Sequence, residues 1–219
     1  IESLKDTEEL MEQYPFVYGA FGIHPDDAEK MTEKTLEEIR QLSRLPKAVA
    51  IGEIGLDYYW HKEEHEHEIQ KKMFLAQMEI AREEKLPFMV HSRDAAKDTL
   101  DLVKDCMKGG MYGGIIHCFS YGKEMAREYL DMGLYLGIGG VVTFKNAKKL
   151  KEVVAYAPLE QLVLETDSPY LSPEPNRGKR NSSLNLPYVA EAIAQIKGCS
   201  AEEVIAVTEE NAKKLLLRK

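Results

Sequence analysis

The chain has 219 residues, enough for one sizeable hydrophobic core, and its content of 44% hydrophobic and 30% charged residues is ordinary for a globular protein. No apolar run reaches the roughly 18 residues that a membrane-crossing helix needs. The formal net charge of -8 argues against a protein that binds nucleic acid through its overall electrostatic potential. It permits an enzyme that binds a few phosphates at a local site. We therefore predict a single domain over residues 1–219 that is not associated with membranes, and we favour a monomer. The three cysteines show no C-x-x-C spacing and fit reduced thiols, so we expect a cytoplasmic protein.

Short apolar, β-branched runs alternate with stretches of helical period, which is typical of βα units around a parallel sheet. After a predicted helix over 1–14, strands are predicted over 16–24, 48–57, 87–92, 113–120, 134–142 and 161–167. An eight-stranded TIM (β/α)8 barrel needs two more βα units and typically about 250 residues. We predict an α/β fold of this barrel type that lacks its first two βα units before Ile1, with an open six-stranded doubly wound sheet as the alternative.

The helices have recognisable starts and faces. Capping-box spacing predicts helix starts at Thr35 with Glu38 and at Ser200 with Glu203. Intervals of four, three and four residues predict one buried stripe, made of Ile69, Met73, Ala76 and Ile80.

Polar side chains stand at the carboxyl ends of five predicted strands: His24, Glu53, His91, His117 and Asp167. A lone histidine at such a place is more often structural than a ligand. A barrel, however, brings every carboxyl strand end to one face, and His with Asp and Glu is a ligand set for divalent metals. The pattern therefore predicts a metal site.

Residues 61–68, HKEEHEHE, are the obvious rival for that site by composition. Successive helical residues advance by about 100°, so His65 and His67 point about 200° apart and cannot share an ion if the following helix includes them. His61 and His65 could hold only an adventitious metal. We interpret the segment as a solvated, charged helix entrance.

The strand ends, taken in order, resemble those of the TatD-related metal-dependent deoxyribonucleases. The matching stretches are GIHP (22–25), GEIGLDYY (52–59), a helix with Gln70, Phe74 and Gln77, VHSRDA (90–95), HCFS (117–120), ETDSPYLSP (165–173) and RGKRN (177–181). They occur in family order over essentially the whole chain. The resemblance implies a TIM barrel of the metal-dependent hydrolase type with a divalent metal centre, commonly of two ions (Mg, Mn or Zn), that hydrolyses phosphodiester bonds.

The resemblance also implies roles for individual residues. Glu53 resembles the carboxylate that contacts both metals, and His91 and His117 resemble ligands of the second ion. Asp167 resembles a ligand of the first ion that also accepts a proton from the attacking water, so Glu53 and Asp167 are the expected catalytic residues. Substrate phosphate would meet a second set of side chains: His24, Arg93, Arg177 and Arg180. Asp94 is expected to orient a neighbouring side chain.

The chain departs from the family pattern in two places. The family opens with a strand bearing Asp-x-His-x-His, and no such strand is present in this sequence. The family usually continues RGxRN with Glu-Pro, where this chain has Ser182 and Ser183.

The expected function is hydrolysis of DNA, or of another nucleic acid, by a metal-activated water. An amidohydrolase or aminoacyl-ester hydrolase on the same barrel is the first alternative, although many amidohydrolases bridge their metals with a carboxylated Lys where this chain offers Glu53. An inactive, truncated form of the nuclease is the second alternative.

Overall fold

A computed structural model describes residues 2–217, which divide into two compact units, one ending at Ile115 and the other beginning at Ile116. The prediction of a single domain stays a prediction. Within the described residues, no helix is both long enough and apolar enough to cross a membrane.

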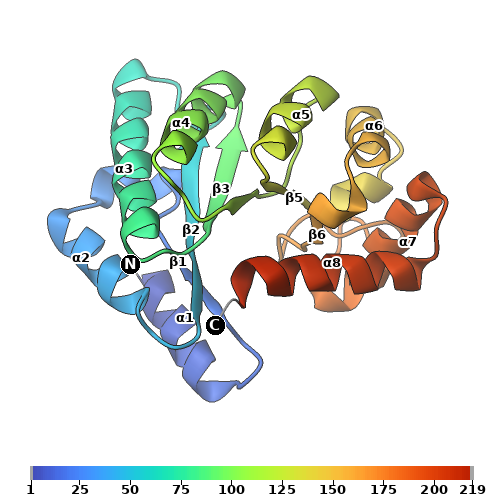
Figure 1. Cartoon of the computed structure of the whole chain (residues 1–219), viewed down its shortest axis with the longest axis horizontal. Helices are drawn as coiled ribbons and strands as arrows, with labels where there is room; N and C mark the ends of the chain where they lie inside the picture. Colours follow the sequence, from blue (N-terminus) through green and yellow to red (C-terminus); the bar gives the residue numbers. More distant parts are fainter. Residues whose placement is uncertain (1, 218–219) are drawn as a thin grey trace. The chain divides into compact units, whose positions relative to one another are not determined.

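The first unit alternates helices with parallel strands (Figure 1). Its elements in chain order are α1 (Glu2–Gln13), β1 (Gly19–Phe21), η1 (Pro25–Lys30), α2 (Glu33–Leu42), β2 (Ala48–Asp57), α3 (Glu64–Glu83), β3 (Phe88–Arg93) and α4 (Ala96–Lys108). The strand β2 pairs in parallel with β1 on one side and with β3 on the other. The predicted α/β alternation is therefore confirmed for this unit.

The strand β2 is buried along its whole length except at Glu53. Its register against β3 shifts between Ile51 and Ile54, and such irregularities re-aim a side chain locally. Gly55 sits directly against β3, where a Cβ would lie 2.0 Å from the His91 carbonyl oxygen. The GEIGLD stretch thus combines close strand contact with one partly exposed carboxylate.

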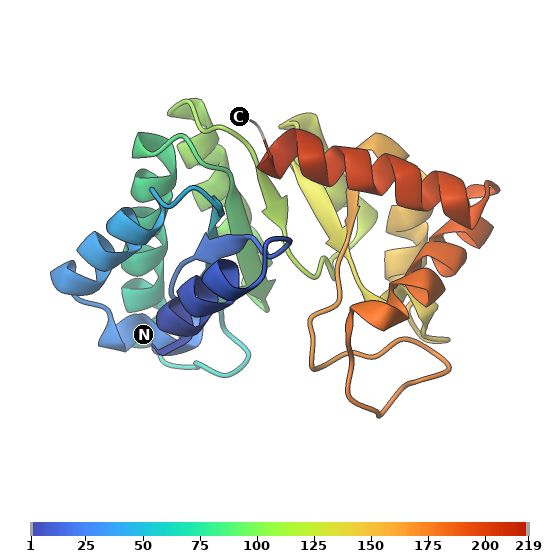
Figure 2. The same ribbon diagram turned by 90° about the horizontal axis from the view of Figure 1, so that it is seen from below.

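The second unit repeats the alternation with shorter strands. Its elements, after β4 (Gly114–Ile116) at the boundary, are α5 (Lys123–Asp131), β5 (Tyr135–Ile138), η2 (Gly140–Thr143), α6 (Lys148–Tyr156), η3 (Leu159–Gln161), β6 (Leu162–Leu164), η4 (Ser183–Asn185), α7 (Leu186–Lys197) and α8 (Ala201–Leu216). The strands β5 and β6 are parallel, with Leu136 opposite Leu162. Residues 165–182 contain turns but no helix or strand, and Figure 2 shows this segment, in orange, as a long loop before α7.

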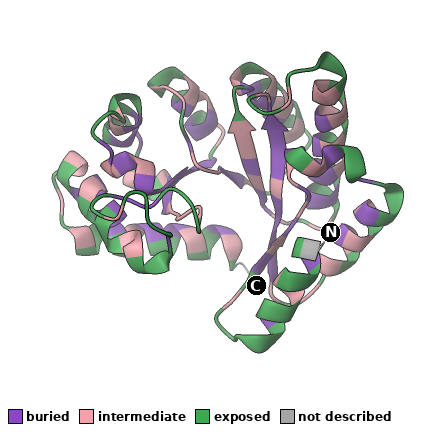
Figure 3. Cartoon of the chain, turned by 180° about the vertical axis from the view of Figure 1, so that it is seen from behind, coloured by how far each residue is buried: buried purple, intermediate pink, exposed green. Residues whose placement is uncertain are grey.

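All six predicted strands are present, and β2 has the predicted bounds. The strand β3 is shifted by one residue at the same length, and the other four are shorter. In these four the polar residues expected at the carboxyl ends mostly follow the strand: β1 stops at Phe21, β4 at Ile116 and β6 at Leu164. The helix predicted over 1–14 is α1. Burial is concentrated on the strands, and the exposed residues lie on the outer helix surfaces and in the loops (Figure 3).

Two expectations about helix detail were wrong. The helix α2 begins one turn earlier than predicted, with Thr32 as the N-cap and Thr35 completing the reciprocal box. On α3 only Ile80 of the predicted stripe is fully buried; the buried face is made of Gln70, Phe74, Gln77, Met78, Ile80 and Ala81. At α8 the prediction holds, since the Ser200 hydroxyl accepts a hydrogen bond from the Glu203 amide at 3.1 Å.

Candidate metal centre

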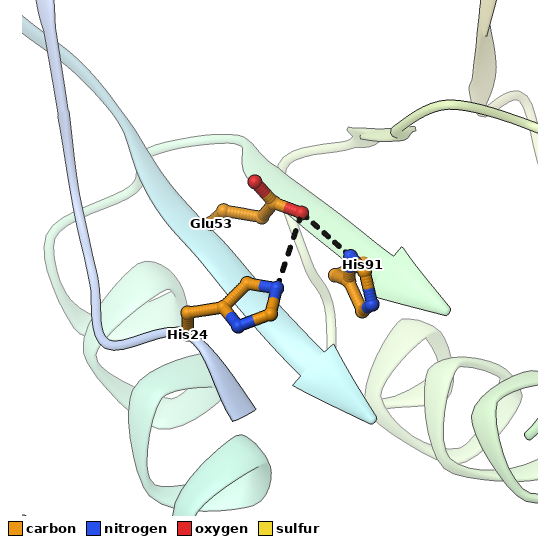
Figure 4. Close-up of side chains that lie close together, drawn as sticks. All are labelled: His24, Glu53 and His91. Carbon is orange, nitrogen blue, oxygen red and sulfur yellow. Dashed lines mark hydrogen bonds and ion pairs between the residues drawn. The ribbon is translucent and has the colours of Figure 1, made fainter. Parts of the chain in front are cut away.

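In the first unit, His24, Glu53 and His91 offer ligand atoms that all lie within 4.8 Å of one another (Figure 4). Glu53 Oε1 lies 2.8 Å from His91 Nδ1 and 3.8 Å from His24 Nε2. The three side chains come from β2, from β3 and from the turn after β1, so the parallel pairing of the strands brings them together. One carboxylate between two imidazoles matches the ligand preferences of Zn²⁺ and related ions.

A fourth side chain, Asp57, holds His91 from the other side. Its Oδ2 lies 3.1 Å from His91 Nε2, and the residue is 1% exposed. Burial opposes ionisation, but the hydrogen bonds from His91 and from the Trp60 amide outweigh it and lower the pKa of Asp57 to about 2. Burial likewise opposes protonation of His91, but hydrogen bonds to Asp57 and Glu53 raise the pKa of that imidazole to about 9.

This arrangement suits an ion held by Glu53 and His91. A metal-ligating histidine usually donates its other ring N–H to a carboxylate, which fixes the ring orientation. Asp57 is placed to accept that hydrogen bond at Nε2, and Nδ1 then faces Glu53. The donor set of the first unit therefore fits a divalent ion.

His24 differs from His91 in how its ring is held. Its Nδ1 accepts a hydrogen bond from the Asp26 amide at 3.2 Å and also lies 3.3 Å from an Asp26 carboxylate oxygen. Burial and the neighbouring His91 lower the pKa of His24, which favours the neutral ring. A neutral imidazole that accepts at Nδ1 carries its proton on Nε2, so His24 presents an N–H donor toward Glu53.

Two buried glutamines of α3 fix the backbone on either side of this cluster. Gln77 accepts from the Ile23 amide at 2.7 Å and donates to the Ile23 carbonyl at 3.2 Å. Gln70 makes the same pair of bonds with Asp57, at 2.9 and 3.2 Å. Each side chain satisfies one residue's amide and carbonyl as a neighbouring strand would.

The second unit holds His117 between two carboxylates in a similar way. Its Nδ1 lies 2.8 Å from Glu165 Oε2, and its Nε2 lies 3.4 Å from Asp167 Oδ1. Glu165 is fixed further by the Cys118 amide, which donates to its Oε1 at 2.6 Å. Room for this carboxylate comes from Gly137, where a Cβ would lie 2.1 Å from Glu165 Oε2.

The predicted phosphate-binding arginines lie on exposed segments. Arg93 is exposed at the end of β3. Arg177 is 4.0 Å from a Glu174 oxygen and stacks over Phe144 at 4.3 Å. Arg180 lines an open cavity of about 540 Å³ together with Thr166 and Ser168, the neighbours of Asp167 in the chain.

The histidine-rich segment is a helix entrance, as interpreted. His61 contacts Glu66 at 3.0 Å and Asp26 at 3.2 Å, and these hydrogen bonds, the one to Glu66 first, raise the pKa of His61. His65 is exposed on α3, while His67 donates to the His61 carbonyl at 2.9 Å and stacks on Tyr58.

Sequence reasoning missed Asp57 and Glu165, which hold the two candidate histidines. Both stand in the quoted motifs, GEIGLD and LETD, beside the carboxylates that were selected. The orienting role was expected of Asp94. This residue is exposed at a left-handed position (φ 53°), and among the described residues no hydrogen bond to its carboxylate is found. The available signal for Asp57 was an Asp at the end of an otherwise apolar strand.

The comparisons with known proteins identify the family of this chain. The sequence model of the TatD related DNase family matches residues 1–217. A relative from Bacillus subtilis, named uncharacterized metal-dependent hydrolase YabD, is 49% identical over 208 residues, or 94% of this chain and 80% of the relative. A relative from Citrobacter rodentium, named 3'-5' ssDNA/RNA exonuclease TatD, is 35% identical, covering 96% of this chain and 81% of its own length.

Among solved structures, the TatD homologue YJJV from Escherichia coli K12 matches with a TM-score of 0.91 and 29% identity, covering 100% of this chain and 83% of that chain. The fold is thus that of an α/β protein of the TIM-barrel type. The chain belongs to the TatD related DNase family. The expected fold class is confirmed, and the doubly wound alternative is set aside by the same likeness.

Proposed function

We propose that this protein is a divalent-metal-dependent nuclease that hydrolyses phosphodiester bonds of DNA. The observation that carries the proposal is His91, held by the buried Asp57 on one nitrogen and facing Glu53 with the other. The names of the relatives, metal-dependent hydrolase and ssDNA/RNA exonuclease, support the same activity.

The proposed ligands are Glu53 and His91 in the first unit and His117 and Asp167 in the second. The proposed ions are two divalent cations, Mg, Mn or Zn. When bound, a divalent ion lowers the pKa of a coordinated water toward about 7 and neutralises negative charge that grows on the phosphate. Asp57 and Glu165 keep the two imidazoles in the orientation that this binding requires.

The remaining residues act on the substrate. Asp167 accepts the proton of the attacking water, whose oxygen bonds to phosphorus as the bond to the leaving nucleotide oxygen breaks. His24 donates from Nε2 to a phosphate oxygen, in accord with its hydrogen bond from Asp26. Arg93, Arg177 and Arg180 bind phosphate oxygens through their planar guanidinium groups.

A substrate panel tests the activity against the amidohydrolase and aminoacyl-ester alternatives. One metal-loaded preparation is assayed on a single-stranded DNA oligonucleotide, a lactone, a dipeptide amide and an aminoacyl ester, each with and without EDTA. We expect cleavage of the oligonucleotide that EDTA abolishes, with rates on the other substrates at least about a hundredfold lower. Faster turnover of the lactone, amide or ester would contradict the proposal.

A further inference from the structure

The geometry points to a base-stacking subsite beside the first-unit cluster, formed by Tyr59 and Trp60 and taking one unpaired nucleobase of a single strand. This inference rests on the proposed function, because it names the form of nucleic acid that the same site receives. We call these two side chains the aromatic platform. Arg93 and Lys62 supply its positive charge.

The platform is tied to the candidate metal ligands through one carboxylate. Asp57 Oδ1 accepts hydrogen bonds from the Tyr59 amide at 2.9 Å and from the Trp60 amide at 3.0 Å. The other oxygen of the same carboxylate holds His91. A nucleotide bound on the platform therefore lies next to the cluster that would act on its phosphate.

The two rings are exposed although they are large and apolar. Tyr59 is 42% and Trp60 is 65% exposed, and their rings meet edge to face with centroids 4.7 Å apart. Exposed aromatic side chains occur singly on many surfaces and need no explanation. Here two of them are adjacent in the loop between β2 and α3. The buried Asp57 carboxylate holds the backbone amides of both.

Cations accompany the rings. The Arg93 guanidinium lies 4.0 Å from the centroid of Tyr59 and 5.6 Å from that of Trp60, and Lys62 Nζ lies 5.2 Å from the Tyr59 ring. Across residues 2–217, no acceptor is found for the Arg93 N–H groups. Arg93 stays beside the platform because it pairs with Asp57 in the sheet and its carbonyl accepts from the Tyr58 amide at 2.8 Å.

Aromatic rings next to unsatisfied guanidinium donors match the chemistry of a single nucleotide. The base stacks on a ring face, and the phosphate takes the guanidinium fork. Stacking uses the π-face that every base has, so the subsite is tolerant of sequence. A base inside a duplex already has both faces covered, so the subsite selects unpaired strands or strand ends.

The test uses the fact that Trp60 is the only tryptophan of the chain. Intrinsic fluorescence of the chain is titrated in EDTA, which prevents cleavage, with three DNA probes: a single-stranded oligonucleotide, an abasic strand of equal length, and a duplex whose two ends are closed by non-nucleotide linkers. The inference predicts saturable quenching by the single strand and little change with the other two. Equal quenching by the abasic strand, or none by any probe, would overturn it.

Affinities of labelled strands provide the second measurement. Trp60→Ala is expected to weaken binding of the base-carrying strand about tenfold, and this difference disappears with the abasic strand. The matched control is Phe16→Ala, another exposed aromatic of the first unit (76% exposed), which is expected to bind as the wild type does. A Trp60→Ala protein that keeps wild-type affinity would contradict the inference.

The outcomes separate this inference from the proposed function. Quenching by single strands in a protein that cleaves no nucleic acid under any metal condition would support the subsite and contradict the nuclease. Suppose instead that the protein cleaves DNA, that no strand quenches the fluorescence of Trp60, and that Trp60→Ala keeps the wild-type affinity. This result would support the nuclease and contradict the subsite.

Discussion

Each candidate metal-binding histidine stands between two carboxylates that have different surroundings. His91 lies between Asp57, which is 1% exposed, and Glu53, the single residue of β2 that is not buried. His117 lies between Glu165, whose other oxygen is bound by a backbone amide, and Asp167. In each pair one carboxylate, Asp57 or Glu165, is held by backbone amides, and the other is the one that we propose as a ligand of the ion.

Alanine substitutions of single residues test which side chains are metal ligands. Glu53→Ala, His117→Ala and Asp167→Ala are each expected to reduce divalent-metal-dependent cleavage of a labelled single strand at least about tenfold, because each removes a proposed ligand. His65→Ala, an exposed histidine of α3, is the control and is expected to keep the wild-type rate. Wild-type rates in the three site variants would refute the site assignment.

At the scale of elements, α3 bonds the backbone beside the site through two polar side chains on its otherwise apolar buried face. Its two buried glutamines bond the backbone of Ile23 and of Asp57, next to His24 and at the end of β2. The apolar period of the sequence predicted the wrong stripe, because a pattern of hydrophobic residues does not include a buried amide. The glutamines were named only through the family resemblance.

Gln77→Leu tests this role of α3. The substitution leaves the Ile23 amide and carbonyl buried without their partner, and an unsatisfied buried group costs about 1 to 3 kcal/mol. We expect the free energy of unfolding to fall by about 2 kcal/mol or more in urea titrations monitored by circular dichroism. Gln41→Leu, an exposed position on α2, should change it by less than about 0.5 kcal/mol; equal effects of the two would contradict the role.

At the scale of the whole molecule, the order of strands could be predicted from the sequence. Which carboxylate orients a histidine and which is the proposed metal ligand could not. Apolar β-branched runs identify parallel strands, and carboxyl strand ends are where such folds place polar side chains. The motifs GEIGLD and LETD each contain two carboxylates, and sequence alone does not say which one is buried. Composition singled out residues 61–68, yet His61 there is engaged by Glu66 and Asp26.

The most direct test of the account is anomalous diffraction from crystals of the full chain loaded with Mn²⁺ or Zn²⁺, recorded at the absorption edge of the metal. We predict an anomalous peak within about 2.0 to 2.6 Å of the Glu53 carboxylate and the His91 imidazole, with Asp57 still bonded to the far side of that ring. A peak on His61 or His65, or no peak near Glu53 and His91 in crystals that contain the metal, would contradict the account.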